Sequence, residues 1–130
     1  MRTTLILLAA VLCLVATGAA ADVAGTYKGS WSGAANGDFR LKLEQAPGGE
    51  WKADIVFTMG TDEVKTKIKS VKVDGSKVDI VYDFDLQGNA LESTVAGELT
   101  GKTMEGTYKT KTVADGSPVD EGTWKVSAQE

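Results

Sequence analysis

Hydrophobic and polar residues alternate along most of the chain after the first 21 residues, which is the pattern of β-strands with one buried face. Phe39–Leu43, Trp51–Met59 and Val78–Leu86 show it most clearly. No segment has the 3.6-residue apolar period of an amphipathic helix. The pattern therefore predicts an all-β domain without helices, and its eight strands are expected near Thr26–Ser32, Phe39–Leu43, Trp51–Met59, Val64–Val73, Val78–Leu86, Leu91–Leu99, Met104–Thr112 and Gly122–Ser127.

Short turns that contain glycine predict which residues face one another across neighbouring strands. Thr100–Thr103 suits a two-residue type II′ turn because Gly101 can take the positive φ that this turn requires. The register that follows pairs Leu99 with Met104, Val95 with Tyr108, Gly97 with Gly106 and Glu92 with Lys111.

A change of parity predicts a β-bulge in the fourth strand. Val64 and Ile68 are inward at even positions, whereas Val71 and Val73 are inward at odd positions, so one extra residue must be absorbed at Lys69–Ser70. With a tight turn at Asp74–Lys77, the expected pairs are Ile68 with Tyr82, Val64 with Leu86, Lys67 with Asp83 and Lys65 with Asp85.

The connection Ala46–Gly49 leaves two registers for the hairpin around it. If Leu43 faces Ala53, unlike charges face each other on the outside, whereas pairing Leu43 with Trp51 would bring like charges together. Directly opposed like charges are unfavourable, which favours the first register.

Sequential hairpins with one apolar face each predict an eight-stranded antiparallel up-and-down β-barrel, since closure buries that face and removes exposed edges. In this fold the strand near Trp124 pairs with the strand near Trp31. The alternative is a two-sheet β-sandwich with Greek-key crossovers, but the connections here are short.

The N-terminal segment has the features of a secretory signal peptide. Arg2 precedes an apolar run from Leu5 to Ala16, and small residues at Ala19–Ala21 offer a cleavage point. We therefore expect residues 1–21 to be removed and residues 22–130 to form one secreted or periplasmic domain, without a membrane span after cleavage. An uncleaved membrane anchor and a lipoprotein acylated at Cys13 are the alternatives.

Composition narrows the possible chemistry. The chain has 130 residues, a net charge of −4, no histidine and one cysteine, which argues against nucleic-acid binding, Ser-His or Cys-His catalysis, and zinc sites built with histidine. The best carboxylate cluster, Asp79, Asp83 and Asp85, lies on an outer strand face, and the expected registers place Asp83 and Asp85 opposite lysines, where nothing would raise a pKa. We therefore expect no enzymatic activity, no metal and no cofactor.

Short motifs resemble those of a known family. Gly29–Trp31 looks like the Gly-x-Trp of lipocalins and other calycins, and Gly122–Trp124 repeats it near the C-terminus. Nearly all of residues 24–127 are similar to small secreted bacterial lipocalin-like modules. The chain lacks the disulfide cysteines and C-terminal helix of full lipocalins, and it lacks the biotin-contacting groups of avidins.

The resemblance and the barrel both point to a small hydrophobic ligand bound inside. The candidate interior residues are Trp31, Phe39, Trp51, Phe57, Tyr82, Phe84, Tyr108 and Trp124. Inward polar residues that could orient a ligand are Thr66, Ser93, Thr110 and Thr112. The alternative is a solid core in a structural or protein-interaction module, with outward apolar candidates at Val56, Val81 and Val113.

Overall fold

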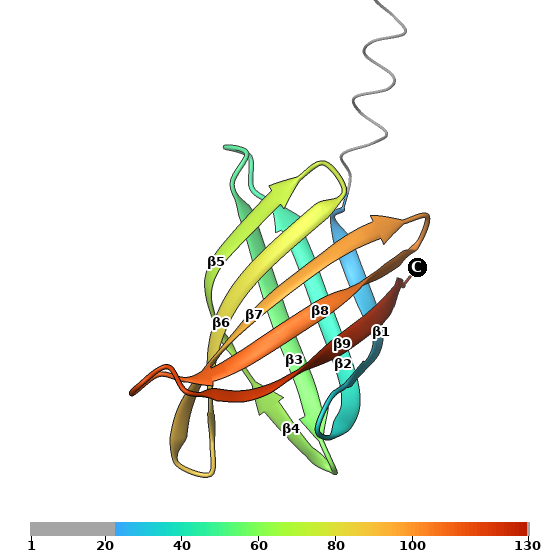
Figure 1. Ribbon diagram of the computed structural model, residues 1–130. Coiled ribbons are helices and arrows are strands. Elements are labelled where there is room, and N and C mark those ends of the chain that lie inside the picture. The colour runs from blue at the N-terminus through green and yellow to red at the C-terminus, as the bar shows by residue number, and fades with distance from the viewer. Residues whose placement is uncertain (1–22, 130) are drawn as a thin grey trace, which may run out of the picture.

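The computed structural model describes residues 23–129, and within them the chain forms nine antiparallel strands and no helix. The strands are β1 (Gly25–Ser32), β2 (Asn36–Gln45), β3 (Trp51–Met59), β4 (Asp62–Lys65), β5 (Lys67–Asp74), β6 (Lys77–Leu86), β7 (Asn89–Thr100), β8 (Thr103–Thr112) and β9 (Pro118–Ala128). They form one curved sheet in the order β4-β3-β2-β1-β9-β8-β7-β6-β5 (Figure 1). The predicted signal segment lies outside the described residues.

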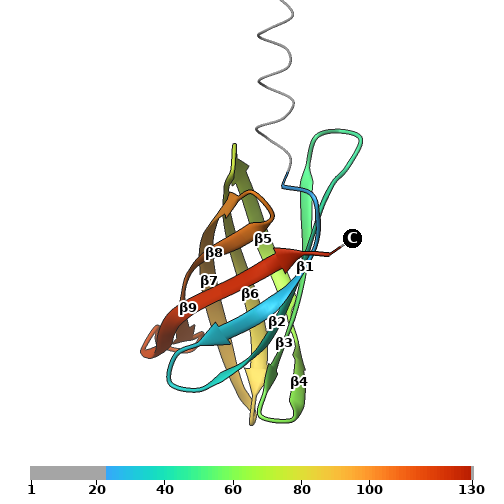
Figure 2. The same cartoon turned by 90° about the vertical axis from the view of Figure 1, so that its right-hand side faces the viewer.

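The first strand of the described chain pairs with the last, which joins the two halves of the sheet. β1 and β9 run antiparallel and side by side (Figure 2). In their register Trp31 lies opposite Trp124. All other paired strands are consecutive in the sequence. This topology is a nearly closed up-and-down barrel and not a two-sheet sandwich, and the predicted pairing of the strands that carry Trp31 and Trp124 is confirmed.

The predicted fourth strand is two strands, which corrects the expected count and two expected pairs. Val64 pairs with Phe57 of β3 and not with Leu86, and Lys65 pairs with Val56 of β3 and not with Asp85. Alternation reports which face a residue presents but not which neighbour it pairs with, so it could not detect the change of partner.

Thr66 marks the break between β4 and β5. Its hydroxyl donates a hydrogen bond to the carbonyl of Ile55 at 2.7 Å and thereby fastens the junction to β3. No ladder joins β5 to β4 or β3 among the described strands, although β3 and β5 are in contact. The barrel is therefore nearly closed, with a seam between β3 and β5.

The other predicted registers are confirmed. Leu43 faces Ala53, Leu99 faces Met104, and the shift between Ile68 and Ser70 is the expected bulge. Gly75 and Gly101 have φ of 63° and 65°, as the two tight turns require.

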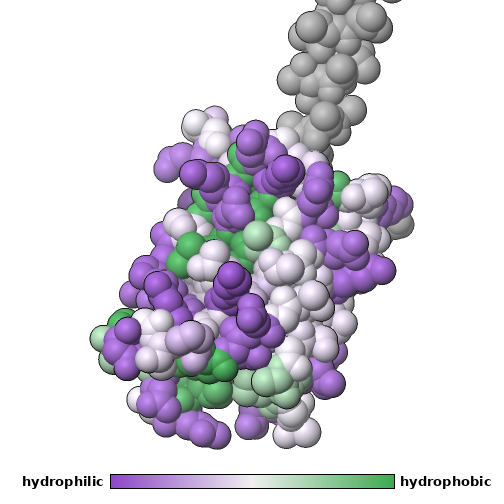
Figure 3. All heavy atoms as spheres, viewed as in Figure 1, coloured by the Kyte–Doolittle hydropathy of each residue, from purple (hydrophilic) through white to green (hydrophobic). Residues whose placement is uncertain are grey.

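One end of the barrel is filled by side chains. Val23 is completely buried, and its carbonyl accepts a hydrogen bond of 2.7 Å from the hydroxyl of Tyr27. The segment before β1 thereby covers this end. Beneath it lies an aliphatic core made of Leu41, Leu43, Ile55, Val78, Ile80, Val95, Met104 and Val126. Hydrophilic residues cover much of the outer face, and hydrophobic residues form small patches on it (Figure 3).

Facing glycines make room for the indole of Trp124. Gly97 of β7 pairs with Gly106 of β8, and Gly106 pairs with Trp124 of β9. A Cβ added to Gly97 would lie 2.4 Å from Cζ2 of Trp124. The lack of a side chain at Gly97 therefore leaves the space that the Trp124 ring occupies.

Candidate functional site

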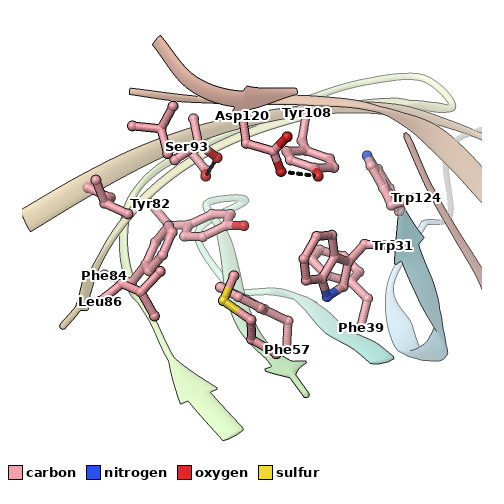
Figure 4. A pocket seen from close by; sticks show the side chains of 14 residues that line it. Trp31, Phe39, Phe57, Tyr82, Phe84, Leu86, Ser93, Tyr108, Asp120 and Trp124 are labelled. Carbon is pink, nitrogen blue, oxygen red and sulfur yellow. Dashed lines mark hydrogen bonds between the residues drawn. The ribbon is translucent and has the colours of Figure 1, made fainter. Parts of the chain in front are cut away.

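The other end of the barrel opens into an aromatic pocket of about 60 Å³ (Figure 4). It lies among the ends of β1, β3, β6 and β8 and the starts of β2, β7 and β9. Its walls are formed by Trp31, Phe39, Phe57, Met59, Tyr82, Phe84, Leu86, Leu91, Ser93, Tyr108, Thr110, Val119, Asp120 and Trp124. The pocket is therefore mostly apolar, with a few polar groups on one wall.

Packed aromatic rings form the apolar part of the pocket. Trp31 stands edge-on to Phe57 and to Tyr108, with 5.9 Å between ring centroids in each pair. Phe57 and Phe84 form another edge-to-face pair at 5.2 Å. The indole Nε1 of Trp31 donates a hydrogen bond to the carbonyl of Thr58 at 2.9 Å, which fixes this ring to β3. Such contacts hold the rings in defined orientations.

The polar part is a row of four inward side chains that crosses neighbouring strands at one level. Tyr82 of β6 pairs with Ser93 of β7, Ser93 with Thr110 of β8, and Thr110 with Asp120 of β9. The hydroxyls of Ser93 and Thr110 are hydrogen-bonded to each other, and Tyr82 is hydrogen-bonded to Ser93. The row gives one wall of an otherwise apolar pocket a line of oxygen atoms.

A bulge at the start of β9 brings Asp120 into this row. Thr110 pairs with Asp120 but Lys111 pairs with Pro118, so Val119 is the extra residue and lies half-exposed at the rim. The Asp120 carboxylate accepts hydrogen bonds from the Tyr108 hydroxyl at 2.7 Å and from the backbone N–H of Ala34 at 3.0 Å. Among the described residues that line the pocket, no other residue is an Asp, Glu, Lys or Arg.

The structure brings together most of the interior residues predicted from the sequence. Trp31, Phe39, Phe57, Tyr82, Phe84, Tyr108 and Trp124 all line the pocket. Trp51 does not, because it begins β3 at the filled end, where it is half-buried against the core. Ser93 and Thr110 are in the polar row, whereas Thr66 lies at the seam and Thr112 holds the β8–β9 loop through Asp115.

Sequence reasoning missed Asp120 because it expected the last strand to begin at Gly122. The signal was present: Asp120 has the same parity as the inward residues Gly122 and Trp124. Extending the alternation by one pair would have placed this carboxylate on the inner face.

The outer carboxylates behave as surface charges. Asp83 faces Lys67 across the β5–β6 ladder as predicted, but the nearer cation is Lys69, whose Nζ lies 4.0 Å from Asp83 Oδ1. Lys69 also binds Glu92 at 2.6 Å, and this ion pair lowers the pKa of Glu92. Among residues 23–129, no group of three or more His, Cys, Asp or Glu side chains could hold a metal ion.

Two pocket tyrosines are held in the neutral form. Burial raises the pKa of Tyr82 to about 12, and the hydrogen bond with Ser93 opposes that shift. Burial also raises the pKa of Tyr108, and the neighbouring Asp120 carboxylate adds to the effect. Both hydroxyls are therefore available as neutral hydrogen-bonding groups at physiological pH.

The raised pKa of Tyr82 predicts a loss of stability in alkali. The pKa of Tyr82 in the folded state, about 12, exceeds the ordinary value of 10. The contribution of Tyr82 to the free energy of unfolding is therefore fully present below pH 10 and is lost as the pH rises from 10 to 12. The full loss from this group is about 2 to 3 kcal/mol. Urea unfolding at pH 9 and pH 11.5 should show a smaller decrease for Tyr82→Phe than for the unaltered protein. Equal decreases would contradict the prediction.

Comparison of the sequence with protein-family models finds no match, and comparison with curated proteins finds none either. None of the described residues belongs to a helix that could cross a membrane. The pocket itself is therefore the basis for assigning a function.

Proposed function

We propose that this chain is a secreted or periplasmic lipocalin-like protein that binds a small hydrophobic ligand in the aromatic pocket and catalyses no reaction. One observation carries the proposal: the barrel is filled at one end, while the other end keeps an apolar, ring-lined pocket. Ligand sites in small barrels are typically apolar with a few polar groups for orientation, as this pocket is.

The volume of the pocket limits the size of the ligand. An engineered apolar cavity of about 150 Å³ holds benzene, whereas this pocket measures about 60 Å³. A ligand must therefore be small, or must extend through the mouth. Met59 and Leu86 are only partly buried, so their side chains have room to move outward. Methionine in particular adapts readily to irregular contacts.

Binding of 1-hexanol, a neutral probe with a short apolar chain, tests the proposal. Titration of the purified protein should give a saturable change in tryptophan emission, because Trp31 and Trp124 line the pocket, with a Kd of about 1 mM or tighter. Leu86→Trp should fill the mouth and weaken binding at least about tenfold, a change of about 1.4 kcal/mol.

Leu99→Trp provides the matched control. Leu99 is also a partly buried leucine near a strand end, but it lies at the filled end and does not line the pocket. This variant should bind 1-hexanol as the unaltered protein does. The absence of saturable binding, or an equal loss in both variants, would overturn the proposed function.

A further inference from the structure

The chemistry of the pocket walls specifies which hydrophobic ligands fit, an inference that rests on the proposed function. Asp120 places a carboxylate at the mouth, and no lysine or arginine lines the pocket among the described residues. Lys109 and Lys111 flank Thr110 on β8 but lie on the opposite, outer face, where Lys111 is 3.4 Å from Glu92. The described lining of the pocket therefore carries one negative charge and no positive charge beside an apolar interior.

The surroundings of Asp120 strengthen its effect on a ligand. A Cβ added to Gly33 would lie 2.0 Å from the Tyr108 hydroxyl and 2.9 Å from Asp120 Oδ2, so the β1–β2 turn packs directly onto this pair. The turn thereby shields one side of the carboxylate from water. Charges interact more strongly in such partly desolvated positions than in bulk solvent.

The carboxylate keeps the capacity to bind a further donor. A carboxylate has about four acceptor positions. The recorded hydrogen bonds to Asp120 come from Tyr108 and Ala34, one on each oxygen. Figure 4 shows Asp120 and Tyr108 side by side above the rings of Trp31, Phe57 and Tyr82. A donor on the ligand can therefore reach the carboxylate while the body of the ligand lies among the rings.

We propose that the pocket selects small organic cations, in which a protonated amine is attached to a short apolar body. The ammonium group binds the Asp120 carboxylate at the mouth, and the apolar body packs among Trp31, Phe57 and Phe84. Aromatic faces also attract cations, so the rings favour an ammonium group that enters more deeply. An anionic ligand such as a fatty acid would place its charge against Asp120, which disfavours it.

Three probes of the same chain length and different charge test the proposal. Hexylamine is protonated at pH 7, 1-hexanol is neutral and hexanoate is anionic. Tryptophan emission should report a Kd for hexylamine about tenfold lower than that for 1-hexanol, and weaker binding still for hexanoate. The advantage of hexylamine should shrink as NaCl is raised, because salt screens the attraction between charges.

Variants at two adjacent carboxylates locate the effect. Asp120→Asn should weaken hexylamine binding about tenfold, leave 1-hexanol within about twofold and improve hexanoate binding. Glu121→Gln is the control, because it removes the same charge from the next residue. Glu121 is exposed on the outer face, opposite Lys109 in the β8–β9 ladder. That variant should leave all three affinities within about twofold. If Asp120→Asn does not fold, the probe series and the salt dependence of the unaltered protein decide the question.

The outcomes separate this inference from the function on which it rests. If none of the three probes binds, the proposed function itself fails. If 1-hexanol or hexanoate binds as tightly as hexylamine, the barrel binds hydrophobic ligands but the selectivity for cations is refuted. If Glu121→Gln weakened hexylamine binding as much as Asp120→Asn does, Asp120 would not be the source of the selectivity for cations.

Discussion

Replacing Gly97 with valine is expected to lower the free energy of unfolding by about 3 kcal/mol. A Cβ at this position would lie 2.4 Å from Cζ2 and 2.6 Å from Cη2 of Trp124, and valine adds two further methyl groups. The indole is held by its surroundings: it is buried, its ring centroid lies 5.4 Å from that of Phe39, and its Nε1 donates a hydrogen bond to the carbonyl of Thr107 at 3.1 Å. A shift of the ring would break these contacts, so the strain spreads into the sheet.

Urea unfolding of a double-mutant cycle measures this effect and its cause. Trp124→Leu removes the ring that Gly97→Val would strike, so the double variant should be more stable than the sum of the two single changes predicts, by about 1 to 3 kcal/mol. Ala96→Val is the control, because it adds the same methyl groups at the neighbouring outward position and should change stability by less than about 0.5 kcal/mol. Additive effects in the cycle would show that Gly97 is required for another reason.

Removal of the Trp31 side chain is expected to cost about 3 to 5 kcal/mol. Its ring is buried, contacts both Phe57 and Tyr108, and is hydrogen-bonded to β3 through the carbonyl of Thr58. Trp31→Ala would leave a large cavity next to the pocket and an unpaired carbonyl at Thr58. Since small domains are stable by only about 5 to 15 kcal/mol, this loss is a large share of the total stability.

Trp51→Ala is the matched control for this prediction. Trp51 is also a tryptophan on a strand, but it is only half-buried at the filled end of the barrel. Its removal should cost about 1 to 2 kcal/mol, because less apolar surface is lost. Thermal and urea unfolding of the two variants should therefore differ clearly. Equal destabilisation would mean that the ring contacts and hydrogen bond of Trp31 add nothing beyond its size.

The register of most strands could be predicted because three local signals agreed. The alternation of apolar and polar residues predicts the buried face of each strand, and glycines predict the positions of the turns. Charges on the outer face distinguish between possible registers, as they do for the pairing of Leu43 with Ala53. The bulge after Ile68 was predictable for the same reason, since it appears as a change of parity. The break at Thr66 was not, because a strand that changes partner without changing face leaves no mark in the alternation.

The apolar half of the candidate site followed from the sequence, but its polar half did so only in part. Large inward rings are visible in a period-two pattern, and seven of the eight predicted ones line the pocket. The pattern does not say at which end of the barrel a ring lies, so it could not show that Trp51 packs on the core away from the pocket. Asp120 was missed because the last strand was expected to begin at Gly122, although Asp120 continues the inward alternation of Gly122 and Trp124.

The pairing of β1 with β9 also determines where anything joined to this domain would sit. Tyr27 lies opposite Ala128, and the backbone N–H of Gln129 donates a hydrogen bond to the carbonyl of Thr26 at 2.8 Å, so both ends of the described chain emerge together beside the filled end. A fluorescent label, a solid support or a fused protein joined directly before Val23 or after Gln129 would therefore be a barrel's length away from the mouth. Immobilised molecules would present their open ends to solution.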